Sequence, residues 1–242
     1  MNENSGITVS VVSHGHAEML SLILSDLANC PEVKKIIVTF NIGYEQNFIA
    51  PVLPENHVKQ IINLRPKGYG ANHNSAFIFC QTSHFCVINP DIRLKSNPFP
   101  TLLKGMEGYG ITAPVVYSPD GEVEDSARKY PIPWRILKRF LGFDKKDYAV
   151  GEDLIYPNWL AGMFLLMRTE DFNHVDGFDE KYFMYLEDVD ICRRIQIAGK
   201  RVTLNPGTQV IHDARRNSHR NFKHFWWHMN SMLRFWSRYY LQ

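Results

Sequence analysis

The feature that most constrains the fold is the alternation of strand-like and helix-like segments in the first 97 residues. Apolar, β-branched runs and amphipathic helical runs follow one another as strand from Ile7, helix over 18–29, strand from Ile36, strand from Val58, helix over 71–81 and strand from Phe85. This pattern predicts βαβ units with right-handed crossovers and a mostly parallel central sheet flanked by helices. Such α/β sheets bind ligands beyond the carboxyl ends of their strands.

The pattern changes after residue 98, where shorter strands and loops are expected. The run from Trp159 to Met167 is apolar, a helix is expected over 186–198, and two short extended pieces, RVTLNP and QVIHD, are expected before a C-terminal amphipathic helix. No repeat or low-complexity linker separates these parts, so the sequence predicts a single domain over 1–242. We divide it into parts at about 1–97, 98–213 and 214–242.

Composition and the N-terminal segment limit where this chain is expected to work. No stretch of the sequence approaches the ~20 consecutive apolar residues of a membrane span. The opening MNENSGITVSVVSHG lacks a basic segment ahead of an apolar one and lacks a small-residue cleavage site, which predicts a cytoplasmic protein. The four cysteines show no C-x-x-C spacing and are expected to be buried, reduced thiols, not zinc ligands.

Two motifs place polar groups where strands are expected to end. The strand FCVIN runs into Pro90-Asp91, which puts a carboxylate at the carboxyl edge of the sheet, and a hard cation bridging two phosphates needs such an oxygen ligand. Asn-Pro-Asp is equally typical of a simple turn. The segment KGYGANHN over 67–74 has glycines that would let amides approach a phosphate at a helix N-terminus, although it lacks the third glycine of a dinucleotide-binding fingerprint.

The most informative stretch is GFDEKYFMYLEDVDICRRIQIAGKRV over 177–202, an acidic cluster ahead of an amphipathic helix. If the helix begins near Leu186, Glu187 and Asp190 share one stripe with Arg194, whereas Asp188 lies on the apolar stripe. Acids in a first turn also stabilise the helix dipole by a few tenths to about 1 kcal/mol. That effect accounts for one or two of them, and not for a third acid flanked by aromatic residues.

Together these residues resemble the family 2 glycosyltransferases of the GT-A fold, and within them the bacterial rhamnosyltransferase-like branch. The resemblance covers nearly the whole chain and is carried by SVVSHG at Ser10, the GYGANHN segment, INPD at Ile88, W-x-x-G-x-x-x-L-x-R from Trp159, GFDEKYFMYLEDVDICRR and the later VIH. It implies a GT-A fold and an inverting, metal-assisted sugar transfer from a nucleotide sugar. Residues 1–97 would then hold the nucleotide, and residues 98–213 the acceptor and the catalytic groups.

The resemblance also implies roles for individual residues. Asp91 stands at the position of the metal-binding D-x-D aspartate and His212 at that of a second ligand for Mg²⁺ or Mn²⁺. Asp188 stands at the position of the general base, next to Glu187. For nucleotide-sugar binding we assign Ser13, Asn41, Lys67, Gly70, Asn74, Asn89, Arg128, Trp159, Gly162 and Arg194. The chain departs from the family in having Phe40 before Asn41, where an acid is usual, and Asn89 as the first residue of D-x-D.

The donor implied by the resemblance is a dTDP- or UDP-sugar. The expected reaction is transfer of a sugar, L-rhamnose from dTDP-rhamnose, to a hydroxyl of a bacterial surface glycan or its lipid-linked precursor. The alternative is a protein of the same fold that binds a nucleotide sugar or a glycan without turnover, since fold alone does not prove activity. No nucleic-acid-binding motif accompanies the basic tail, so a nucleic-acid partner is not expected.

The C-terminal segment is rich in aromatic and basic residues. Phe222, Phe225, Trp226, Met229, Leu233, Trp236 and Tyr240 recur at helical spacing, and Lys223, Arg234 and Arg238 fall on other faces. Such a helix suits the anionic inner face of the cell membrane. Equally, the stripe suits packing on the domain or on a second subunit in a homodimer.

Overall fold

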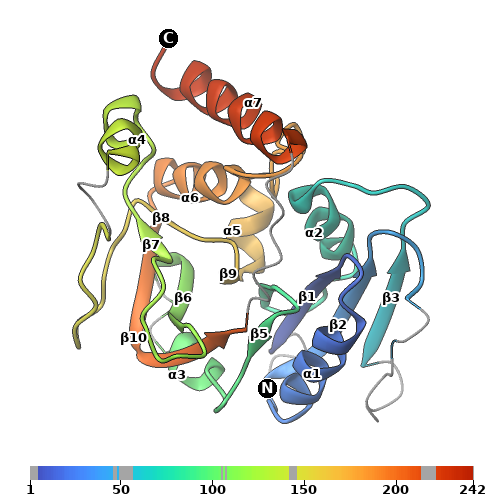
Figure 1. Ribbon diagram of the computed structural model, residues 1–242. Helices are drawn as coiled ribbons and strands as arrows, with labels where there is room; N and C mark the ends of the chain where they lie inside the picture. Colours follow the sequence, from blue (N-terminus) through green and yellow to red (C-terminus); the bar gives the residue numbers. More distant parts are fainter. Residues whose placement is uncertain are drawn as a thin grey trace.

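A computed structural model describes residues 5–45, 48, 57–104, 106, 108–141, 146–213 and 222–241 of the chain. Its centre is an eight-stranded sheet in the order β3-β2-β1-β4-β9-β6-β10-β5 (Figure 1). Most neighbouring strands are parallel, and β9 runs antiparallel between β4 and β6. The expected mostly parallel α/β sheet is therefore confirmed.

The first part of the chain forms the parallel half of the sheet. Its elements are β1 (Ile7–Ser13), α1 (Ala17–Ala28), β2 (Val33–Phe40), β3 (Val58–Ile62), α2 (Tyr69–Phe77) and β4 (His84–Ile88). The strands β1, β2 and β4 are almost entirely buried, which explains why they read as continuous apolar runs and not as alternating ones. Each expected strand and helix of this half is present.

The second part adds short strands and helices around β9. Its elements are β5 (Ile92–Arg93), α3 (Phe99–Leu103), β6 (Tyr109–Tyr117), β7 (Ala127–Arg128), α4 (Pro133–Phe140), β8 (Trp159–Leu160), β9 (Phe164–Arg168), α5 (Thr169–His174), α6 (Glu187–Ile197), β10 (Arg201–His212) and α7 (Phe222–Tyr239). The apolar run from Trp159 is two strands: β8 pairs with β7, and β9 enters the main sheet.

One sequence-based expectation about strands was wrong. The pieces RVTLNP and QVIHD are a single strand, β10, which pairs with β6 on both sides of a register irregularity between Asn205 and Gln209. Proline and glycine at 206–207 suggested a break in the sequence, but they fall where the ladder is interrupted and so cost few hydrogen bonds.

Helices cover both faces of the sheet. Apolar residues of α1 and α3 pack with one face, and those of α2, α5 and α6 pack with the other. The C-terminal helix α7 lies across the outer side of α6, beside α4 (Figure 1). Among the described helices, none is long and apolar enough to cross a membrane. Cys30, Cys86 and Cys192 are buried free thiols, as expected, and Cys80 is only partly buried.

Candidate functional site

The carboxyl ends of β1, β2 and β4 meet at one edge of the sheet and carry three of the predicted residues. Asn41 holds the 67–74 segment there: its Oδ1 accepts the backbone N–H of Lys67 at 2.8 Å, and its Nδ2 donates to the Lys67 carbonyl at 3.0 Å. Ser13 Oγ accepts the N–H of His16 at 3.1 Å, and the N–H of Asn89 donates to the Met163 carbonyl at 2.9 Å.

Sequence reasoning missed a buried amide network behind this edge. Asn63 Nδ2 donates both to Asn41 Oδ1 at 2.8 Å and to Asn72 Oδ1 at 2.7 Å. Because Asn41 is engaged by this network and by Lys67, its side chain builds the edge of the sheet and supports the loop. Lys67 Nζ donates to Ser75 Oγ at 3.1 Å, on the exposed side.

Gly70 and Asn74 both contact Phe178 in the segment ahead of α6. A Cβ on Gly70 would lie 2.6 Å from Cβ of Phe178. Asn74 bonds both backbone groups of Phe178, accepting from its N–H and donating to its carbonyl at 2.9 Å. These contacts hold α2 against the segment that precedes α6. Asn74 and Phe178 are 104 residues apart in the chain.

The two predicted metal ligands lie together where β10 pairs with β5. His212 Nε2 is 3.2 Å from Asp91 Oδ2, and His212 Nδ1 is 2.8 Å from Glu124 Oε2. Burial opposes protonation of His212, but the two carboxylates outweigh it and raise the pKa of His212 to about 9. Glu124, in the polar segment ahead of β7, was not predicted, because that segment has no periodicity to mark it.

Asp91 is the residue of this pair that fits a divalent cation. Its Oδ1 is buried and has no hydrogen-bond partner among the described residues, and a buried carboxylate oxygen without a partner is the kind of group a hard cation satisfies. His212 Nε2 would become a ligand only by giving up its contact with Asp91. In the described part of the chain, no group of three or more His, Cys, Asp or Glu is arranged to hold a metal.

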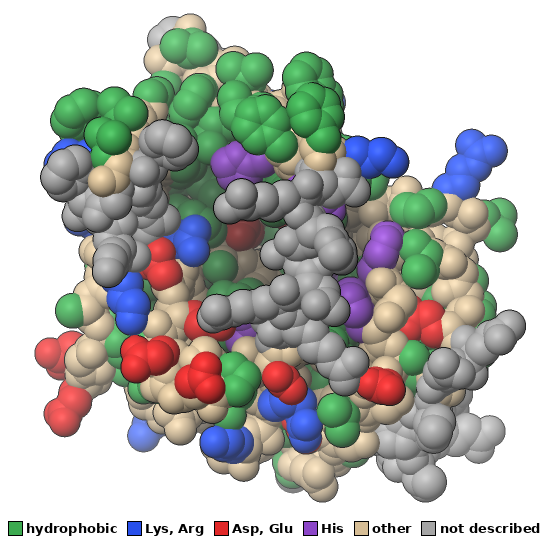
Figure 2. Space-filling model, in the orientation of Figure 1, with side chains coloured by type: hydrophobic (Ala, Val, Ile, Leu, Met, Phe, Trp, Pro, Cys, Tyr) green, Lys and Arg blue, Asp and Glu red, His purple; other side chains and the backbone are tan. Residues whose placement is uncertain are grey.

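A cavity of about 510 Å³ opens beside this pair. Its walls come from the segment around β7 and β8, the start of α6, and the facing sides of α4 and α7, and the predicted residues among them are Arg128, Trp159, Glu187 and Asp188. Glu124 also lines it, so the cavity reaches the partner of His212. Figure 2 shows the hollowed centre of this face, with acidic and histidine side chains inside it.

Asp188 is held at the cavity by backbone groups. Its Oδ2 accepts the N–H of Gly162 at 3.0 Å and its Oδ1 accepts the N–H of Val189 at 2.8 Å. The Gly162 carbonyl accepts a hydrogen bond from Tyr69 Oη. A Cβ on residue 162 would lie 3.0 Å from Tyr69 Oη, so a glycine allows this close approach. Burial raises the pKa of Asp188, and the two amides only partly offset this. The residue is therefore fixed in position and has a raised proton affinity.

Tyr69 connects the base candidate with the metal-ligand candidate. Tyr69 is half-buried, and the pKa of its phenol is raised first by loss of solvent around it and then by the charges of Glu187, Asp188 and Asp91. All three carboxylates therefore lie near one tyrosine. The sequence included Tyr69 in the 67–74 segment, but a tyrosine there does not reveal a partner 93 residues away.

Glu187 lines the cavity with Asp188, is 6% exposed, and its Oε2 has no hydrogen-bond partner among the described residues. Its carboxylate has a backbone hydrogen bond in the first turn of α6 and none to Arg194. Burial, followed by the charge of Asp188, raises the pKa of Glu187 well above its usual range. Seven residues of helix span ~10 Å, which is too far for Glu187 to reach Arg194 directly.

Arg194 does not reach the cavity. Its Nε donates to Asp190 at 2.7 Å, and it also bonds the carbonyl of Val175. Asp190 is fully buried and accepts further bonds from Arg238 at 3.2 Å and from the Tyr239 hydroxyl at 2.9 Å. This set ties α6 to α7 and gives Arg194 a structural role.

Arg128 and Trp159 face each other across the β7–β8 ladder. The Arg128 guanidinium lies 5.3 Å from the centre of the Trp159 ring, and its Nε donates to the Asp125 carbonyl at 2.7 Å. Trp159 Nε1 donates to the Lys129 carbonyl at 2.9 Å. The positive charge of Arg128 acts on Asp188, whose pKa it lowers in part. The predicted residues at the cavity thus comprise one cation, two acids and an indole ring.

Comparison with known proteins supplies the family. The chain is 30% identical over 250 residues to rhamnosyltransferase WbbL of Escherichia coli, an alignment that covers 96% of this chain and 93% of that protein. This chain belongs to the rhamnosyltransferase-like family 2 glycosyltransferases. It is also 32% identical over 148 residues to an N-acetylglucosaminyl-diphospho-decaprenol L-rhamnosyltransferase of Mycobacterium tuberculosis, covering 56% of this chain and 48% of that one. No protein-family model matches this chain.

Solved structures confirm the GT-A fold. GalNAc-T7 with UDP, GalNAc and Mn²⁺ aligns with a TM-score of 0.67 at 14% identity, over 89% of this chain and 44% of that one. The Pyrobaculum calidifontis mannosyltransferase PcManGT, in complex with GDP-Man and Mn²⁺, aligns at 0.61 and 12% identity, over 91% and 59% of the two chains. At these identities the likeness shows the fold alone.

Proposed function

We propose that this glycosyltransferase transfers L-rhamnose from dTDP-rhamnose, with inversion, to a hydroxyl of a surface glycan or its lipid-linked precursor. Support for the sugar comes from the relatives, since both are named as rhamnosyltransferases. The observation that carries the proposal is the placement of Asp188, half-buried at the wall of a cavity and held by the Gly162 amide. A base with a raised pKa at a cavity wall suits deprotonation of a bound hydroxyl.

In this mechanism the acceptor oxygen attacks the anomeric carbon of the donor while Asp188 takes its proton. The bond from that carbon to the diphosphate oxygen breaks on the opposite face, so that the configuration inverts. Asp91, with His212 if it releases Asp91, would hold a divalent cation. Such a cation would supply Lewis-acid stabilisation of the departing diphosphate. Arg128 would add positive charge there, and the Trp159 ring would support a sugar face.

The test is a transfer assay with dTDP-rhamnose and a lipid-diphosphate-linked sugar acceptor, measuring dTDP release and the anomeric configuration of the product by NMR. We expect inverted product that disappears in excess EDTA and returns with Mg²⁺ or Mn²⁺. Asp91→Ala should nearly abolish turnover while the fold stays intact. Full turnover in EDTA would remove the metal from the mechanism.

The inactive alternative is separated by the same reagents. A nucleotide-sugar-binding protein without turnover would show thermal stabilisation by dTDP-rhamnose but no dTDP release with any acceptor. A ligand at 100 times its dissociation constant stabilises by about 2.7 kcal/mol, so binding is measurable apart from catalysis.

A further inference from the structure

Two helices on the outer side of the cavity expose apolar side chains next to each other. Figure 2 shows hydrophobic side chains gathered above the hollowed centre, over α4 and α7. Large apolar residues of this docking face are 46–78% exposed and comprise Trp134, Leu137 and Leu141 at α4, and Phe222, Phe225 and Trp226 on α7. A contiguous exposed set of this kind marks an interaction site more often than scattered single residues do.

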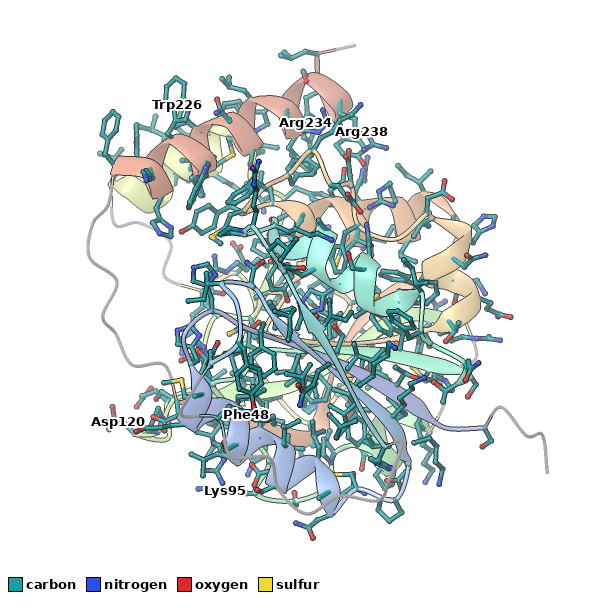
Figure 3. The ribbon with its side chains drawn as sticks, turned by 90° about the vertical axis from the view of Figure 1, so that its right-hand side faces the viewer. Phe48, Lys95, Asp120, Trp226, Arg234 and Arg238 are labelled. Atoms are coloured by element: carbon teal, nitrogen blue, oxygen red, sulfur yellow. The ribbon has the colours of Figure 1, made fainter. Side chains whose placement is uncertain are left out.

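The docking face is distinct from the side of α7 that packs on the domain. On the packed side, Met232 and Phe235 are buried, and Trp236 Nε1 donates to the Pro131 carbonyl at 2.7 Å just ahead of α4. The single aromatic stripe expected from sequence is therefore divided: Trp236 packs on the domain, while Phe225 and Trp226 remain exposed. Figure 3 shows Trp226 on the outer side of α7.

The basic residues of α7 are divided in the same way. Arg234 and Arg238 turn toward the domain (Figure 3), where their guanidinium groups lie 2.6 and 3.0 Å from Asp179. They are not the lipid-facing cations that the sequence suggested. Lys138 lies on α4 with its ammonium 5.8 Å from the centre of the exposed Trp134 ring, which places a cation at the docking face itself.

Charge favours an anionic partner for this face. Neither α4 nor α7 contains an aspartate or glutamate, whereas α4 contains three basic residues in eight. A second copy docked by a two-fold axis would bring the same basic residues together with no acid from these helices to neutralise them. Tryptophan and phenylalanine beside lysine suit the boundary between phosphate headgroups and acyl chains.

We propose that α4 and α7 dock this enzyme on an anionic lipid surface, at the edge of its own catalytic cavity. The inner sides of the same helices line the cavity through Arg135 and Ile136 of α4 and His228 and Met232 of α7. A lipid-linked acceptor, if the proposed function holds, would keep its chain in the bilayer while its sugar hydroxyl enters between these helices. Docking would then raise the local acceptor concentration without taking part in the chemistry.

The test is co-sedimentation of the full chain with vesicles of phosphatidylglycerol and phosphatidylcholine in equal parts, against pure phosphatidylcholine. We expect preferential binding to the anionic vesicles that falls as salt rises. The combined variant Trp134→Ala, Phe225→Ala and Trp226→Ala should lower the partition coefficient about tenfold or more, since binding strength scales with inserted apolar area. The matched control is Leu64→Ala with Ile78→Ala, which are 100% and 77% exposed elsewhere, and it should bind as the unaltered chain does.

Failure of this proposal is distinguishable from failure of the proposed function. The triple variant should still transfer rhamnose to a water-soluble acceptor analogue while losing most transfer to acceptor embedded in vesicles. Absence of vesicle binding, or equal binding by the triple variant, would overturn the docking proposal whatever the assay shows. A dimer in light scattering that the triple variant disrupts, without vesicle binding, would assign the face to a second copy. Normal vesicle binding with no transfer to any acceptor would instead overturn only the function.

Discussion

Helix α6 carries carboxylates in two different environments. At its start, Glu187 and Asp188 face a cavity with no basic side chain bonded to them among the described residues, and burial raises the pKa of both. Asp190, in the next part of the same helix, is fully buried but accepts hydrogen bonds from Arg194, Arg238 and Tyr239. A buried carboxylate with cationic partners is costly to disrupt once paired, whereas a carboxyl group that loses solvent without such partners has a raised proton affinity.

The largest expected effect tests the cavity side. Asp188→Asn keeps the shape of the side chain and removes its ability to take a proton. Turnover should fall by about 10²- to 10⁴-fold, the usual contribution of a general base. Isothermal titration with dTDP-rhamnose should give nearly unchanged donor affinity. If Asp188→Asn kept most of its kcat and Glu187→Gln lost it, the base would be Glu187.

The matched change on the packed side is Asp190→Asn. This change leaves Arg194 without its buried charged partner and weakens the link to α7. The free energy of unfolding should fall by about 3 kcal/mol. The Arg238 pair contributes little of this, because solvent screens its partly exposed guanidinium. Urea denaturation measures this. The folded fraction should retain a kcat close to that of the unaltered enzyme, and a loss of kcat as large as that of Asp188→Asn would break the comparison.

A smaller effect is expected from Tyr69→Phe, which removes the hydroxyl that bonds the Gly162 carbonyl. We assign Tyr69 as a positioning residue, because Gly162 in turn donates to Asp188. With that support gone, kcat should fall about tenfold through misplacement of the base, while the KM for the donor changes little. Tyr182→Phe is the control, since Tyr182 is buried and its hydroxyl has no hydrogen-bond partner among the described residues. Equal losses in both variants would indicate general loosening of the core.

The smallest effect concerns pH. Since the pKa of Asp188 is raised, its ionised fraction begins to fall at a higher pH than that of an ordinary carboxyl near ~4. The acid limb of kcat/KM should therefore lie above that value. Glu187→Gln should leave the limb nearly in place, because the charge of Asp188 raises the pKa of Glu187, which is therefore still protonated and uncharged while Asp188 titrates. Because the folded-state pKa of Glu187 is also raised, it contributes stability below its unfolded pKa that is lost as pH rises through the folded value. In thermal unfolding scans at a series of pH values, Glu187→Gln should show a smaller fall in Tm as the pH rises.

Particular residues show how far sequence reasoning reached. The strand ends carrying Ser13, Asn41 and Asn89 were predictable, since apolar runs bounded by polar residues mark buried strands. The start of α6 was predicted within one residue, but the left-handed backbone of Tyr185 and Leu186, with φ of 72° and 64°, was not. Such conformations are uncommon for large side chains and are imposed by surrounding packing. They bring Glu187 to the cavity, a position that helical periodicity did not indicate.

The sequence by itself determined the α/β alternation, the family and the short list of acidic residues, because periodicity and motif spacing are local properties of the chain. Tertiary structure decided which acid has which partner: Glu124 reaches His212 across 88 residues, Tyr69 reaches Gly162 across 93, and Tyr239 reaches Asp190 across 49. Whether a carboxylate is paired or left facing a cavity depends on the groups that other elements bring within about 3 Å of it. No local pattern records those contacts, and they separate Asp188 from Asp190.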